Sequence, residues 1–149
     1  MEGVRKMKIS MSIAKKRIAT VWFSFGGFLF IIMFIQTLGE HYGAKVNEAW
    51  SWFLPTIFPT LSLIIAVLIS DAKEINNTQK YVDKFLFHLT MIVSIVYLLL
   101  IFLVIFIDPL SPNISNIELM KLSGLGLGPF QGIVIACLGV FFSKQGTQN

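Results

Sequence analysis

The sequence predicts an all-α integral membrane protein in which four transmembrane helices form one bundle. Of its 149 residues, 55% are hydrophobic and 13% are charged, which is too apolar for a soluble domain of this length. The run 85–107 (FLFHLTMIVSIVYLLLIFLVIFI) would form a helix of about 35 Å, slightly more than the ~30 Å hydrocarbon core of a bilayer. Three further apolar runs, 18–38, 50–70 and 122–142, have similar lengths. We therefore expect a single membrane domain over residues 18–142, with a short tail at 143–149.

The segment 1–17 that precedes the first span is strongly basic. Its cationic residues are Arg5, Lys6, Lys8, Lys15, Lys16 and Arg17. Because they lie directly before an apolar run, they favour contact with anionic lipids or a cytoplasmic protein partner, and not with nucleic acid. Its apolar positions at helical spacing are Val4, Met7, Met11, Ala14 and Ile18. This spacing predicts a helix lying in the membrane interface. The period-two alternation of Ile9, Met11 and Ile13 leaves open a cationic tail that only sets orientation.

The first span, 18–38, is longer than the apolar part of a signal peptide and is followed by no small-residue cleavage site, so we expect an uncleaved anchor. Thr20, Ser24 and Gly27 share one helical face. Because Gly27 follows Gly26, another backbone can approach this helix closely. We therefore predict a helix contact at Gly27.

The second span, 50–70, begins with the sequence WSWFLPTIFPT. Pro55 and Pro59 lie on one side of the helix, and each removes a backbone donor, which predicts a kink. Irregular backbone at membrane depth is tolerated where protein or water covers it, so the kink indicates either a hinge in a pore-lining helix or a static packing feature. The candidate pore or hinge residues are Pro55, Thr56, Pro59, Thr60, Ser62 and, in the fourth span, Gln131, which we expect to hydrogen-bond across helices.

The predicted spans contain almost no ionisable chemistry. No carboxylate lies inside them, which argues against a proton-coupled exchanger. Apart from Tyr97 and Cys137, the one titratable side chain in the spans is His88. It is a candidate pH sensor, although a histidine near a helix end is also explained by a local hydrogen bond or by snorkelling to the interface.

Ser115 and Glu118 lie just before the fourth span, 122–142. They fit a capping box and predict a short helix to about Leu122. The glycines that follow lack the preceding strand and the Lys-Ser/Thr pair of a phosphate-binding loop. We expect Pro129 in the first turn of the fourth helix. Small residues at a spacing of four then predict a helix-packing groove. Its members are Gly128, Gly132 and Ala136, with Gly139 nearby.

Charge predicts the orientation. Ten of the twelve Lys and Arg residues lie in the N-terminal segment, the second connection or the C-terminal tail. By the positive-inside rule, both termini and the second connection face the cytoplasm. The expected location is the inner (plasma) membrane of the cell.

Chemical groups for catalysis are missing from the pattern. The spans hold no nucleophile–base pair and no paired carboxylates, the single cysteine, Cys137, forms no intramolecular disulfide, and His41 with its neighbouring glutamates has no spacing that fixes a metal. We therefore expect neither enzymatic activity nor a cofactor. The leading hypothesis is a homo-oligomeric channel, pore or membrane-perturbing effector. The alternative is a non-catalytic membrane anchor or regulatory subunit of a larger complex that binds a cytoplasmic partner.

Overall fold

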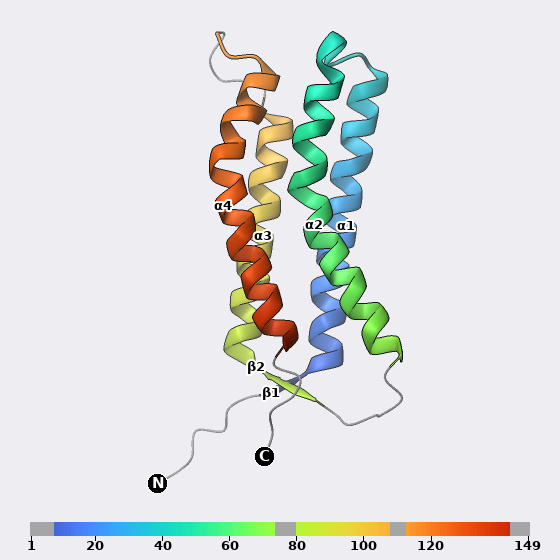
Figure 1. Cartoon of the computed structure of the whole chain (residues 1–149), viewed down its shortest axis with the longest axis vertical. Helices are drawn as coiled ribbons and strands as arrows, with labels where there is room; N and C mark the ends of the chain where they lie inside the picture. Colours follow the sequence, from blue (N-terminus) through green and yellow to red (C-terminus); the bar gives the residue numbers. More distant parts are fainter. Residues whose placement is uncertain (1–7, 74–79, 108–112, 144–149) are drawn as a thin grey trace.

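The computed structural model describes residues 8–73, 80–107 and 113–143 and forms a bundle of four long helices (Figure 1). The helices are α1 (Met11–Leu38), α2 (Val46–Lys73), α3 (Lys84–Phe106) and α4 (Asn116–Ser143). Each is long and apolar enough to cross a membrane, so the predicted four-span architecture is confirmed. A short 3-10 helix, Gly43–Lys45, connects α1 to α2.

A two-stranded antiparallel sheet lies at one end of the bundle, here called the sheet end (Figure 1). Strand β1 (Lys8–Ser10) precedes α1 and pairs with β2 (Tyr81–Asp83), which precedes α3, with Ile9 opposite Val82. The N–H of Met11 then donates to the carbonyl of Lys80 over 2.9 Å. The sheet therefore ties together the starts of two helices that are distant in the sequence.

The predicted interfacial helix is wrong for residues 8–10, while an interfacial position of residues 11–17 stays a prediction. Lys8–Ser10 form β1, and residues 11–17 are the first turns of α1 itself, continuous with the span. The alternation around Ile9 suits a strand, because it places Ile9 against the bundle while the backbone pairs with β2. The earlier part of the predicted helix, with Arg5 and Lys6, lies outside the described residues.

The fourth helix begins earlier than the predicted span. The capping box is confirmed, because the N–H of Ser115 donates to the Glu118 carboxylate over 2.9 Å and the N–H of Glu118 donates to Ser115 Oγ over 3.3 Å. The helix that starts there continues without a break to Ser143. Pro129 therefore lies in the interior of α4 and not in a first turn, which corrects the expectation for this residue.

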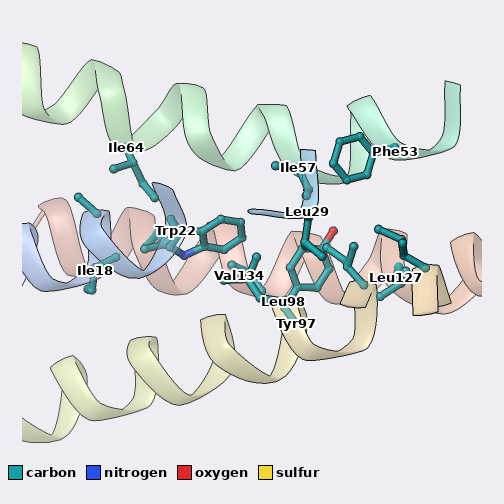
Figure 2. Close-up of a cluster of buried hydrophobic side chains, with 14 of the residues drawn as sticks. Ile18, Trp22, Leu29, Phe53, Ile57, Ile64, Tyr97, Leu98, Leu127 and Val134 are labelled. Atoms are coloured by element: carbon teal, nitrogen blue, oxygen red, sulfur yellow. The ribbon is translucent and has the colours of Figure 1, made fainter. Parts of the chain in front are cut away.

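Large side chains from all four helices fill the interior (Figure 2). Trp22 of α1 and Tyr97 of α3 are both fully buried, and their ring centroids lie 6.1 Å apart. Leu98 and Val134 close the space beside them. The outer surface is also apolar, with Ile31 58% and Leu125 77% exposed, as a lipid-facing surface requires.

Polar contacts hold both ends of the bundle. At the sheet end, Lys15 of α1 forms a 2.6 Å ion pair with Asp71 of α2. At the opposite end, the Tyr42 hydroxyl donates to Gln36 Oε1 over 2.5 Å. Burial raises the pKa of Tyr42 to about 12, so this hydroxyl remains a donor at neutral pH.

Candidate hinge in α2

The two prolines of α2 lie on the outer surface, while the threonines that follow them lie inside. Pro55 and Pro59 are exposed, and Thr56 and Thr60 are buried. This arrangement follows from helical geometry, because residues four apart share a face and the next residue is turned by 100°. The predicted common side of the two prolines is therefore the outer side of the bundle.

Gln131 of α4 supplies a donor that α2 lacks. In a regular helix the N–H of residue 59 would donate to the carbonyl of residue 55, but Pro59 has no N–H. Instead, Gln131 Nε2 donates to the carbonyl of Pro55 over 3.0 Å and to that of Thr56 over 2.9 Å. The expected hydrogen bond of Gln131 across helices is confirmed.

The third helix contacts the same point. The Tyr97 hydroxyl donates to the carbonyl of Thr56 over 2.8 Å, and this bond is buried. The Thr56 hydroxyl donates in turn to the carbonyl of Trp52 over 2.6 Å. The segment 55–59 of α2 is thus held from both α3 and α4. Sequence reasoning missed Tyr97, although a tyrosine in the middle of a span signals a buried hydroxyl that needs a partner.

Several buried polar atoms near this point have no hydrogen-bond partner within the described part of the chain. They are Trp22 Nε1, Trp52 Nε1, Thr60 Oγ1 and Ser94 Oγ. Thr60 follows Thr56 by one helical turn, Ser94 precedes Tyr97 by three residues, and the Trp22 ring neighbours the Tyr97 ring. The interior next to the segment 55–59 of α2 therefore carries hydroxyl and indole groups able to bind water or another polar group.

The six candidate pore or hinge residues do not form one surface. Thr56 and Gln131 meet directly, and Thr60 lies inside next to them. Ser62 is exposed on the outer side. Leu29 and Leu98 are also buried in this interior (Figure 2), so within the described residues Thr56 and Thr60 lie in a packed core.

The predicted helix-packing residues are turned away from the other helices. Gly27, Gly128, Gly132 and Ala136 are exposed. An added Cβ at Gly27, Gly128, Gly132 or Gly139 would meet no atom within 4 Å. An added Cβ at Gly26 would instead lie 3.7 Å from Ile57 and Leu61, and one at Gly124 would lie 3.7 Å from Trp52. Contacts made by the predicted residues between copies stay a prediction.

The candidate pH sensor lies near the sheet end. His88 is exposed, and its Nδ1 lies 2.6 Å from the carbonyl of Lys84, one turn earlier in α3. Its ring meets Phe87 edge-on, with centroids 5.5 Å apart. The side chain thus makes a local contact on the outside of the bundle, and pH sensing by His88 stays a prediction.

The three basic residues of the N-terminal segment that lie in α1 divide into two groups. Lys15 is only 4% exposed, because its ammonium pairs with Asp71 and lies 6.0 Å from the ring centroid of Phe142. Lys15 therefore belongs to the interior contacts of the sheet end. Lys16 and Arg17 are exposed and remain available to lipid or to a partner.

Histidine and acidic side chains do not gather into a ligand set in the part of the chain that the structure describes. No group of three or more His, Cys, Asp or Glu residues there is placed to hold a metal ion. His41 Nε2 instead lies 2.7 Å from the side-chain nitrogen of Asn116. The site is thus built from hydroxyl, amide and backbone groups.

No protein-family model matches the chain, and no similar curated protein or solved structure was found. Its four apolar helices indicate a multi-pass membrane protein.

Proposed function

We propose that this chain assembles into a homo-oligomer that forms a channel or pore in the membrane, or perturbs it in a similar way. The observation that carries the proposal is the open surface of α4. Gly128, Gly132 and Ala136 are exposed, and an added Cβ at either glycine would meet no atom of the same chain within 4 Å. A helix of a second copy can approach its backbone there, as small residues permit in membranes.

Assembly is needed because one copy is closed. Trp22, Tyr97 and Leu98 are at most 1% exposed and fill the centre of the bundle. A path for ions therefore runs between copies, or opens when the helices of each copy rearrange.

The proposed moving element is the part of α2 around Pro55 and Pro59. The carbonyl of Pro55 is bound by the side chain of Gln131 and not by the helix ladder, so bending α2 there breaks fewer backbone hydrogen bonds than bending a regular helix. The hydroxyls of Thr60 and Ser94 can bind water when α2 bends there and the bundle opens. In this proposal α2 is kinked at Pro55 and Pro59, and the kink is a hinge.

The proposed orientation follows from charge. Ten of the twelve Lys and Arg residues belong to the termini and the second connection, which places these segments in the cytoplasm of a cell with an inner (plasma) membrane.

The experiment is ion flux through the full-length protein in liposomes, with the molar mass measured in detergent alongside. The wild type should have several times the 16.8 kDa mass of one chain and should release ions. Gly132→Leu should reduce both the mass and the flux. Gly126→Leu is the matched control, because Gly126 also has no atom within 4 Å of an added Cβ but lies outside the small-residue groove.

A wild type that is monomeric, or oligomeric but silent at every voltage and pH tested, would refute the proposal. Retention of full flux in Gly132→Leu would refute the role of the α4 groove.

The alternative function, a membrane anchor or regulatory subunit with a cytoplasmic partner, is favoured by one observation. Lys16 and Arg17 are exposed at the sheet end, which faces the cytoplasm in the proposed orientation. Replacing Arg5, Lys6, Lys8, Lys16 and Arg17 by glutamine, while Lys15 keeps its ion pair with Asp71, should release such a partner and leave ion flux unchanged. Ion flux through the protein without any cytoplasmic partner would favour the pore over the anchor.

A further inference from the structure

An apolar groove opens on the outer surface between α1 and α2. Its volume is about 260 Å³, which exceeds the ~150 Å³ of an engineered cavity that accommodates benzene. Gly26 and Gly27 line it together with Phe23, Phe30 and Phe58. Each of these three rings is at least 40% exposed, so the groove is open to the lipid phase.

The groove exists because of two adjacent glycines with different roles. At Gly26 an added Cβ would lie 3.7 Å from Ile57 and from Leu61, so this glycine sets the close approach of α1 to α2. At Gly27 an added Cβ would meet no atom within 4 Å. The second glycine thus leaves space that the side chains of the described bundle do not fill.

A positive charge lies on the same face of α1, toward the sheet end. Lys16 precedes Phe23 by seven residues and Gly27 by eleven, and both spacings return to one face of a helix. At 1.5 Å per residue, Lys16 lies about 10 Å along the axis from Phe23. Lys16 is exposed, whereas its neighbour Lys15 is paired with Asp71. The apolar groove and an exposed lysine therefore share one face of α1, with the lysine nearer the end of the span.

We propose that this groove binds an anionic phospholipid, with one acyl chain between α1 and α2 and the headgroup phosphate at Lys16. The charge and the groove follow the order of a lipid molecule, from the membrane surface inward. Arg17, exposed next to Lys16, adds to the positive potential at the headgroup.

A helix from another copy is a poorer occupant of this groove. Close helix packing in membranes uses small residues repeated at a spacing of four. The residues four before and four after Gly27 are Phe23 and Ile31, which are 40% and 58% exposed. Two large side chains thus flank the single glycine and obstruct a helix backbone, while a flexible acyl chain passes between them. The inference does not depend on pore activity.

The test is native mass spectrometry of the full-length protein in detergent, titrated with phosphatidylglycerol or with phosphatidylcholine of the same chains. We expect a one-lipid adduct that favours phosphatidylglycerol. Lys16→Gln should weaken its affinity about fivefold, as expected for one cation at an anionic surface. Gly27→Leu fills the groove and should reduce phosphatidylglycerol binding to the level of phosphatidylcholine.

Two control variants match these changes. Gly126→Leu adds the same side chain at another open glycine, on α4 and outside its small-residue groove, and Lys121→Gln removes the same charge at the other end of the bundle. Both should bind lipid as the wild type does. Circular dichroism and gel filtration report whether Gly27→Leu folds, and if it does not, Lys16→Gln decides alone.

Equal affinity for the two lipids, or undiminished binding by both Lys16→Gln and Gly27→Leu, would overturn the proposal. A change of oligomer mass in Gly27→Leu without any lipid adduct in the wild type would instead assign the groove to a second copy. Because flux is not a readout here, the outcome is separate from that of the pore proposal.

Discussion

Gln131 of α4 donates a 3.0 Å hydrogen bond to the carbonyl of Pro55 in α2, the carbonyl that Pro59 deprives of its helical donor. A side chain from one helix thus completes the backbone hydrogen bonding of another. In the apolar interior of a membrane no water is available to hydrogen-bond such a carbonyl, so its protein partner contributes to the stability of α2 at this point.

Removing this partner should destabilise the bundle in a way that depends on Pro59. Gln131→Leu should lower the free energy of unfolding by about 1 kcal/mol, which is the scale of hydrogen bonds between membrane helices. In a Pro59→Ala background, residue 59 again donates to the carbonyl of residue 55, so Gln131→Leu should cost less. Denaturation by sodium dodecyl sulfate in mixed micelles, followed by circular dichroism, measures all four proteins of this cycle.

Equal losses in the two backgrounds would show that Gln131 acts through some contact other than the freed carbonyl. The second bond of Gln131, to the carbonyl of Thr56 over 2.9 Å, should contribute equally in the two backgrounds. Pro59→Ala leaves this bond in place, together with the bond that Tyr97 donates to the same oxygen.

The sequence was sufficient to predict the four spans and the bond made by Gln131. The spans follow from long apolar runs, and a glutamine inside one of them needs a partner in an adjacent helix. The spacing of four between Pro55 and Pro59 also predicted correctly that both prolines lie on one side of α2. These features depend on composition and on spacing along a single helix.

The sequence did not reveal which face of each helix points inward. In a soluble protein the polar face marks the outside, but here the lipid is as apolar as the core, so Ile31 on the surface and Leu29 in the interior look alike. Gly27 was predicted as a contact, whereas its neighbour Gly26 makes it. The pairing of Lys15 with Asp71 likewise depends on two helices meeting, which no local pattern encodes.

The two adjacent glycines of α1 should respond oppositely to the same substitution. Gly26→Leu forces a large side chain against Ile57 and Leu61, which an added Cβ already meets at 3.7 Å. Overpacking of this kind costs about 1–3 kcal/mol. Gly27→Leu enters open space and should leave the free energy of unfolding in lipid-free detergent unchanged or slightly raised, because leucine favours helix over glycine. Thermal unfolding followed by circular dichroism compares the pair.

A loss of stability in Gly27→Leu equal to that in Gly26→Leu would mean that α1 is rotated relative to α2. That result would also remove the basis for a groove at this position.

The ion pair at the sheet end should matter more than the ion pair at the opposite end. Lys15 and Asp71 lie 2.6 Å apart with side chains 5% and 33% exposed, whereas Lys121 and Glu48 lie 2.6 Å apart with side chains 63% and 41% exposed. Asp71→Asn leaves the buried ammonium of Lys15 without a full counter-charge, and we expect a loss on the order of 2 kcal/mol, between the values for surface and fully buried pairs. Glu48→Gln is the matched control and should change the unfolding midpoint little, because water screens its partner.

Salt provides the second discriminating measurement for these two pairs. Raising the ionic strength from 0.01 to 1 M shortens the Debye length from about 30 to about 3 Å and should weaken exposed pairs first. The difference in stability between wild type and Asp71→Asn should therefore persist at high salt, since the Lys15 ammonium is shielded by the ring of Phe142 and by the helices around it. If that difference vanished at 1 M salt, the Lys15 side chain would have to be solvated. The sheet end, where β1, α1 and α2 meet, would then be an open surface and not a closed contact.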